Sequence, residues 1–92
     1  MTSSYPIRAV AKLTSIPEDT LRAWERRYRA VTPRRSSRGR LYSDEEIQRL
    51  VLLREAVEQG HSIGQIATVS DHQLRMLLRK TVDVALEKGS GR

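Results

Sequence analysis

Cysteine and phenylalanine are both absent from the chain, and its aromatic side chains are limited to one tryptophan and three tyrosines. Without cysteine, the chain has no disulfide, no thiolate metal ligand and no cysteine nucleophile. Its 92 residues are 38% hydrophobic, which suffices for the modest aliphatic core of one domain but not for a large catalytic cleft. We therefore expect one small domain that is held together by packing alone.

Long hydrophobic runs are also missing. No apolar run approaches the roughly 20 residues that a membrane helix needs. The first residues lack the basic-then-apolar pattern of a secretion signal. The sequence therefore predicts no membrane association and a cytoplasmic location at the nucleoid.

Patterns typical of enzymes and metal sites are absent as well. His61 and His72 have no carboxylate or thiolate at metal-ligand spacing. The chain has no nucleophile elbow, no glycine-rich phosphate loop and no pattern of paired buried carboxylates. We predict no catalytic residue, no metal and no enzymatic activity in this domain.

Charge is plentiful and unevenly distributed. The net charge is +6, but residues 1–42 carry 10 lysines and arginines against 3 acidic residues, whereas residues 43–92 carry 7 against 8. All eight cations from Arg22 to Arg40 are arginines, and Glu25 is the only acid among them. The guanidinium fork binds phosphates and guanine edges in a bidentate manner. This segment therefore favours a nucleic acid as the partner over a merely solvated surface.

Apolar spacing predicts a helix-turn-helix at the start of the chain. Apolar residues from Ile7 to Leu13 share one face of a short helix, and residues 14–16 break it. Pro17 suits a first helical position, and the two acids after it complement the helix dipole, so a second helix is predicted over residues 17–28. Two short helices joined in this way are typical of a helix-turn-helix, whose second helix enters the major groove.

The helical period fails over residues 29–42. Residues 31–33 look extended, Arg34 to Gly39 look like an exposed loop, and residues 40–42 look extended again. This pattern predicts a two-stranded wing beside the helix-turn-helix.

Three further helices are predicted after the wing. The run from Ser43 to Glu46 fits a capping box at the start of a strong helix that ends at Gly60. A cap of the same type at Ser62 begins a short helix, and residue 70 or 71 caps the last one. The apolar positions expected to face the core are Ile47, Leu50, Val51, Leu53, Val57, Ile63, Ile66, Ala67, Leu74, Leu77, Leu78, Val82 and Leu86.

These elements predict an all-α fold with a small β wing, that is, a winged helix-turn-helix with about five helices and a two-stranded hairpin. The domain is expected to span residues 1–88. Residues 89–92 are expected to form a flexible tail or a linker to a further C-terminal domain.

Three stretches of the chain carry a resemblance to a known family. They are YPIRAVAK from Tyr5, IPEDTLRAWER from Ile16 and PRRSSRGRLYSDEEIQRL from Pro33. In this order they resemble the N-terminal domain of the MerR family of transcription regulators. The run from Gly60 to Ile63 is similar to the turn before the fourth helix of that family. The resemblance implies a winged helix-turn-helix that binds double-stranded DNA.

One feature is most similar to a particular branch of this family. The form LRAWERRY, with Trp24 in place of a tyrosine, resembles regulators that join this domain to a cobalamin-binding C-terminal half. The resemblance implies that a full-length protein binds cobalamin outside this domain, while no cofactor is expected within it. Three residues depart from the family pattern: Ser15 replaces a turn glycine, Pro17 a capping serine and His61 an aromatic residue. The departure at Ser15 is expected to strain or tilt the turn.

The periodicity of the second helix indicates which of its side chains face DNA. With Leu21 toward the core and about 100° per residue, Glu25 and Tyr28 lie within about 40° of the core direction. The outward face combines a methyl group with guanidiniums, which suits thymine methyls, guanine edges and phosphates. The predicted contacts of this recognition helix, with Asp19, Ala23 and Arg26 outermost, are Asp19, Thr20, Arg22, Ala23, Trp24, Arg26 and Arg27.

Two aromatic residues have two interpretations each. Trp24 lies about 60° from the core axis, so it either plugs the core or contacts the DNA backbone, and the family resemblance slightly favours the contact. Tyr42 either anchors its strand, which we favour, or donates its hydroxyl to a phosphate. The predicted contacts of the wing, to the minor groove or to phosphates, are Arg34, Arg35, Arg38, Arg40 and Tyr42.

The leading hypothesis is a sequence-specific transcription regulator, a repressor, that binds a palindromic double-stranded DNA operator as a dimer of a longer protein. The fragment alone is expected to be monomeric, because its apolar stripes are used in one core. One alternative is an architectural factor similar to phage excisionases, which bends DNA but generally lacks the later helices. Another is a basic module that an acidic antirepressor protein captures by competing for the DNA-binding face.

Overall fold

The computed structural model describes residues 4–37 and 39–79. The predictions for Arg38, Val82, Leu86 and residues 89–92 therefore lie outside the described residues. In chain order the elements are β1 (Ser4–Pro6), α1 (Ile7–Thr14), α2 (Glu18–Tyr28), β2 (Arg34–Ser36), β3 (Gly39–Ser43), α3 (Asp44–Glu58), α4 (Ile63–Ile66) and a helix over residues 71–79. This order confirms the predicted fold class. Among the described residues, no helix is long and apolar enough to cross a membrane.

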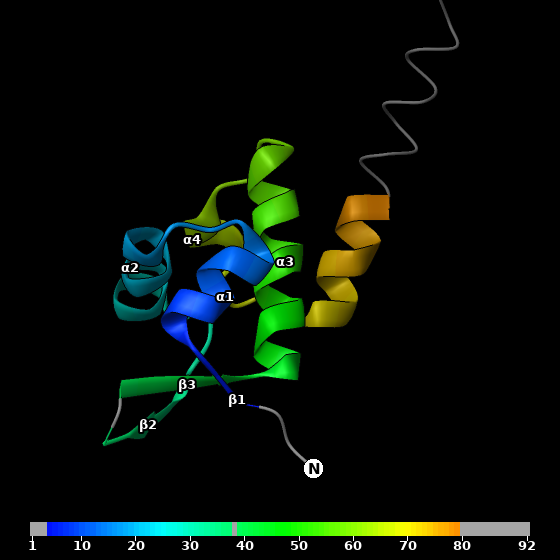
Figure 1. The fold of residues 1–92 in the computed structure, drawn as a ribbon. Coiled ribbons are helices and arrows are strands. Elements are labelled where there is room, and N and C mark those ends of the chain that lie inside the picture. Colours follow the sequence, from blue (N-terminus) through cyan, green and yellow to red (C-terminus); the bar gives the residue numbers. More distant parts are fainter. Residues whose placement is uncertain (1–3, 38, 80–92) are drawn as a thin grey trace, which may run out of the picture.

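Helix α3 lies at the centre of the molecule (Figure 1). Helices α1 and α2 pack on one side of it, and the helix over residues 71–79 lies on the other side. The small sheet lies at the N-terminal end of α3, because β3 leads directly into that helix. The recognition helix and the wing are thereby both attached to the same central element.

The sheet has three antiparallel strands in the order β1-β3-β2, one more than the predicted hairpin. Strand β1 pairs with β3 through Tyr5 and Tyr42, and β2 pairs with β3 through Arg35 and Arg40. Strand β1 is not predicted from the sequence, because three residues that include Pro6 show no strand periodicity. The loop predicted from Arg34 to Gly39 is too long, since residues 34–36 belong to β2.

The turn between α1 and α2 contains a residue with left-handed backbone torsion angles. Ser15 has φ 61° and ψ 28°, the conformation that a glycine adopts without strain. The buried Thr14 hydroxyl stabilises the same turn, because it donates to the Val10 carbonyl at 2.7 Å and accepts from the Ile16 N–H at 3.3 Å. Ser15 thus occupies a conformation that favours glycine, and the strain expected from a serine at this position stays a prediction.

The predicted helix caps differ in their outcome. At α3 the capping box is confirmed, because the Glu46 N–H donates to Ser43 Oγ at 3.2 Å and the Ser43 N–H donates to Glu46 Oε1 at 3.0 Å. Ser70 caps the last helix by accepting from the Gln73 N–H at 3.2 Å. The side-chain cap predicted at Ser62 is wrong. Helix α4 is only four residues long, and the Ser62 carbonyl, rather than its hydroxyl, accepts the N–H bonds of this turn.

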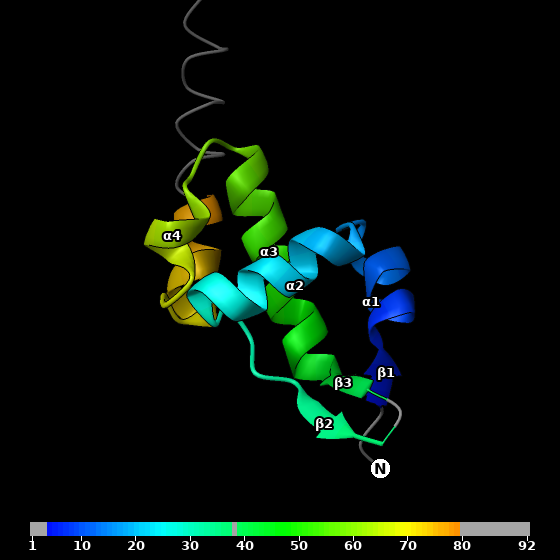
Figure 2. The same ribbon diagram turned by 90° about the vertical axis from the view of Figure 1, so that its left-hand side faces the viewer.

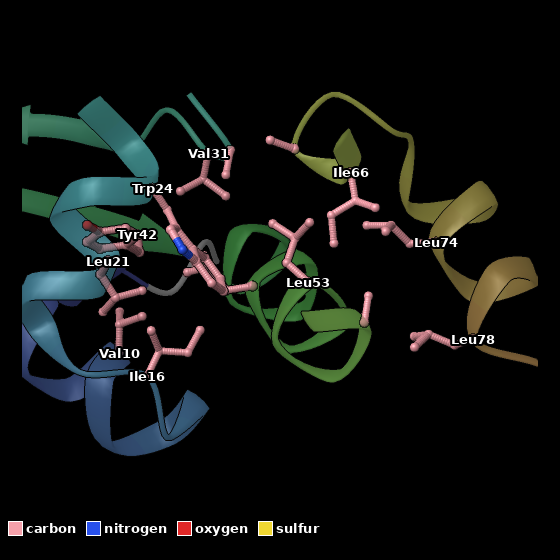
Figure 3. Close-up of a cluster of buried hydrophobic side chains, with 14 residues drawn as sticks. Val10, Ile16, Leu21, Trp24, Val31, Tyr42, Leu53, Ile66, Leu74 and Leu78 are labelled. Carbon is pink, nitrogen blue, oxygen red and sulfur yellow. The ribbon is translucent and has the colours of Figure 1, made fainter. Parts of the chain in front are cut away.

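A single cluster of buried side chains forms the core (Figure 3). Helix α3 contributes Leu50, Leu53 and Ala56, of which Ala56 was not expected. Ile47 and Val57, predicted to face the core, are only partly buried against it. The buried hydrophobic residues are Val10, Ile16, Leu21, Trp24, Ala30, Val31, Tyr42, Leu50, Leu53, Ala56, Ile66, Ala67, Leu74 and Leu78.

Arg49 connects α3 to three other segments, although the sequence places it among the polar positions. Its side chain is only 17% exposed. Its Nε donates to the Ala30 carbonyl at 2.7 Å, and its Nη2 donates to the Ala67 carbonyl at 2.6 Å. Its Nη1 forms an ion pair with Asp71 Oδ1 at 2.7 Å. One guanidinium thus joins the segment after α2, the end of α4 and the start of the last helix.

Candidate nucleic-acid interface

Helix α2 and the β2–β3 hairpin project from the same side of the molecule. In Figure 1 both lie on the left, and in Figure 2, which faces that side, α2 crosses the front above the hairpin. This is the arrangement in which a helix and a wing can contact one duplex together. The arginine-rich segment of the sequence supplies both elements.

Of the seven predicted contacts of α2, three are exposed, whereas Ala23, which was expected among the outermost, is half-buried. The Asp19 side chain is 99% exposed, and Arg26 and Arg27 are also exposed. The remaining predicted contacts other than the tryptophan are half-buried, namely Thr20, Arg22 and Ala23. Helix α2 therefore presents two exposed arginine side chains and one exposed carboxylate on its outer surface.

Trp24 is buried, with 8% of its surface exposed. Figure 3 shows its ring between the side chains of α1 and α2 and Leu53 of α3. Of the two roles considered for Trp24, the structure shows the first, in which its ring fills the core. Burial of the ring fixes the rotation of α2 about its own axis, and so determines which residues of this helix face outward.

Arg22 and Arg27 have partners within α2. Arg22 forms ion pairs with Glu18 at 3.3 Å and with Asp19 at 3.4 Å, one turn earlier on the helix. The Arg27 guanidinium lies 5.6 Å from the centre of the Tyr28 ring. The exposed ion pairs of Arg22 contribute little to stability, so a DNA phosphate can replace Glu18 or Asp19 as its partner at a small cost in free energy.

In the wing, Arg34 and Arg35 are exposed and Arg40 is not. Arg34 donates to Ser4 Oγ at 3.4 Å. Arg40 is among the predicted DNA contacts, but its side chain is only 25% exposed and its Nε lies 2.7 Å from Glu25 Oε2. Arg38 lies outside the described residues.

Glu25 is the residue of this site that the sequence analysis missed. Its side chain is 15% exposed and faces the wing from α2. Besides Arg40, it lies 3.9 Å from Arg35 Nη2 and accepts from the Tyr42 hydroxyl at 3.4 Å. A signal was present in the sequence, because a carboxylate near the core direction of a helix requires a partner.

Tyr42 is 1% exposed, so its side chain anchors strand β3 and is not placed on the surface where its hydroxyl could donate to a phosphate. Burial raises the pKa of Tyr42 to about 12, and the charge of Glu25 adds to this effect. The hydroxyl therefore stays protonated and donates to the carboxylate at neutral pH. It joins β3 to the recognition helix from inside the molecule.

Comparisons with known proteins agree with this geometry. A family model described as "MerR HTH family regulatory protein" matches residues 5–73. The chain is 37% identical over 65 residues to the HTH-type transcriptional repressor CarH of Myxococcus xanthus, covering 70% of this chain and 22% of that protein. It is 39% identical over 69 residues to the repressor CarA of the same organism, covering 67% and 24%.

A third relative is the HTH-type transcriptional regulator MlrA of Escherichia coli, which is 36% identical over 63 residues, covering 67% of this chain and 26% of that protein. The chain thus spans about a quarter of the length of these relatives. No solved structure matches it.

Proposed function

Because the chain belongs to the MerR family of helix-turn-helix regulatory proteins, we propose that it binds double-stranded DNA sequence-specifically and acts as the DNA-binding domain of a transcription repressor. The observation that supports this most directly is the common face of α2 and the hairpin, with exposed arginines on both. They are Arg26, Arg27, Arg34 and Arg35.

Each element has its own task in this proposal. Helix α2 enters the major groove, where Arg26 reads a guanine edge and Ala23 contacts a thymine methyl group. Asp19 and Thr20 lie toward the same bases, and Arg22 and Arg27 flank them on phosphates. Arg34 and Arg35 of the wing contact the backbone or the minor groove.

The operator and the rest of the protein belong to the same proposal. Two of the relatives named above are repressors, and they are about four times as long as the match. We propose a palindromic operator that is bound by a dimer of a longer protein, because two half-sites then multiply the affinity of each domain. We propose cobalamin as the effector of that longer protein, bound outside residues 1–92.

The test compares two arginine variants on a duplex selected in vitro and on random duplex. Arg26→Ala should lose about 1–3 kcal/mol of binding on the selected duplex and much less on random DNA, because it removes a base contact. Arg34→Ala should weaken binding to both duplexes and reduce the slope of log K against log salt by about 0.9, because it removes a phosphate contact. Equal losses on both duplexes for Arg26→Ala would contradict the base-reading role.

A second proposal concerns the alternative partner. Carboxylates spaced like phosphates on an acidic protein can pair with the same exposed arginines, and such an antirepressor would compete directly with the operator. NMR titration with an acidic protein encoded near the target genes should shift signals of α2 and the wing. Shifts centred on α3, α4 and residues 71–79 would contradict direct competition.

A further inference from the structure

Glu25 is surrounded by groups of the wing although it belongs to the recognition helix. Arg40 Nε lies 2.7 Å from one of its oxygens and Arg35 Nη2 lies 3.9 Å from the other. The Tyr42 hydroxyl donates to the same carboxylate at 3.4 Å. One side chain of α2 thus contacts three side chains of β2 and β3.

The register of the hairpin explains why a carboxylate is needed there. Arg35 and Arg40 are directly opposed on β2 and β3, and like charges in such cross-strand pairs repel. The negative charge of Glu25 lies close to both guanidiniums. It therefore stabilises a hairpin whose two strands would otherwise be destabilised by their own charges.

Burial makes the pair with Arg40 difficult to exchange. The Glu25 side chain is 15% exposed and that of Arg40 is 25% exposed. If a DNA phosphate drew Arg40 away, the carboxylate would stay largely buried without its closest cation, which is costly. Arg34 and Arg35 are exposed, and Arg35 lies at the longer distance of 3.9 Å from Glu25, so a phosphate can draw either of them away at lower cost.

We infer that Glu25 is a positioning residue that fixes the wing relative to the recognition helix and keeps Arg40 off the DNA, so that it increases sequence discrimination at the expense of non-specific affinity. This inference rests on the proposed DNA-binding function. A wing at a fixed position can contact the backbone only when α2 is in its correct register in the groove. A loosened wing with a released Arg40 would contact the backbone in many registers.

The test is Glu25→Gln, compared with Glu58→Gln as the matched control. Glu58 pairs with Arg54 one turn away on α3, so the control also removes one negative charge and releases one arginine, without touching the wing. With Glu25→Gln we expect tighter binding to random duplex and a salt slope that is steeper by about 0.9, because a released Arg40 neutralises one more phosphate. The ratio of selected to random affinity should fall about tenfold, the size of one mismatched base pair. The control should leave this ratio unchanged.

Parallel losses on both duplexes with Glu25→Gln, at the wild-type salt slope, would overturn the inference, because they would indicate only a damaged fold. A wild-type protein that binds no duplex at all would instead refute the proposed function itself.

Arg40→Met provides a second, independent test if Glu25→Gln does not fold. It should reduce the discrimination ratio and leave the salt slope unchanged. A slope reduced by about 0.9 would show that Arg40 contacts a phosphate and would overturn the inference.

Discussion

At the scale of single residues, backbone strain is concentrated where a side chain occupies a glycine conformation. Ser15 at the end of α1 and Arg29 at the end of α2 both have positive φ, 61° and 51°. The Arg29 N–H donates to the Glu25 carbonyl and the Ala30 N–H donates to the Trp24 carbonyl, which ends α2 in the way that a C-terminal glycine usually does. The residues before and after α2, Ser15 and Arg29, therefore keep a backbone conformation that non-glycine residues disfavour, because the packing around them maintains it.

Replacing Ser15 with glycine should stabilise the domain. The substitution relieves the left-handed strain but adds backbone entropy to the unfolded chain, so the free energy of unfolding should rise by about 0.5–1 kcal/mol. Urea denaturation followed by circular dichroism measures this difference. Ser62→Gly is the control, because φ is −81° there and glycine should lower stability. A destabilised Ser15→Gly protein would show that the turn is not strained.

At the scale of elements, Arg49 determines how the segment after α2 and the last helix lie against α3. Its guanidinium, rather than an apolar contact, links these segments, because two backbone carbonyls and the Asp71 carboxylate converge on it. The side chains of Arg49 and Asp71 are 17% and 35% exposed, so the pair is partly buried. Removing Arg49 would leave two backbone carbonyls and this carboxylate without their partner, which costs more than losing an exposed ion pair. The segment that Arg49 holds at Ala30 leads directly from the recognition helix to the wing.

Arg49→Met should therefore lower the free energy of unfolding by about 3 kcal/mol, since methionine keeps the apolar stem but satisfies none of the three oxygens. Arg54→Met on the same helix removes an i,i+4 pair with Glu58 and should cost less than about 1 kcal/mol. Chemical denaturation of the two variants side by side gives the comparison. Equal losses would mean that Arg49 is an ordinary surface residue.

At the scale of the whole molecule, the apolar faces of the helices are directed into one core. Leu50 and Leu53 of α3 and Leu74 and Leu78 of the last helix are all buried. Among the described residues, the large hydrophobic side chains left exposed are Leu13 and Met76, at 58% and 59%. Leu13 and Met76 lie on different helices. Met76 lines a shallow apolar hollow with Val69, Gln73 and Leu77, and a small apolar surface of this kind is common on monomers.

We therefore predict that the 92-residue chain is a monomer that binds one half-site weakly. Sedimentation velocity at micromolar concentration should give a single species of monomer mass. The affinity for an operator with two half-sites should rise greatly when two copies are linked. A stable dimer would contradict this prediction. In that case Met76→Asp would test whether the exposed face of residues 71–79 forms the interface.

The sequence by itself determined the features that depend on neighbours along the chain. Apolar spacing located α1, α2 and α3, the Ser43 to Glu46 run specified a capping box, and the density of arginine indicated the segment that we propose binds DNA. Each of these signals is local, since a helix period or a cap involves residues three or four positions apart. The expectation of strain at the serine after α1 came instead from the resemblance to a family in which a glycine occupies this turn.

Only the tertiary structure decided which distant groups meet. Strand β1 exists because β3 offers it an edge, and nothing in Ser4–Pro6 itself specifies a strand. Glu25 pairs with Arg40 across 15 positions, and Arg49 reaches Ala30 and Asp71 across 19 and 22. Which of the eight arginines from Arg22 to Arg40 have exposed side chains depends on the register of the sheet and on the packing of Trp24 in the core. Local patterns therefore located the arginines, and the folded chain decided which of them are exposed on the proposed DNA-binding face.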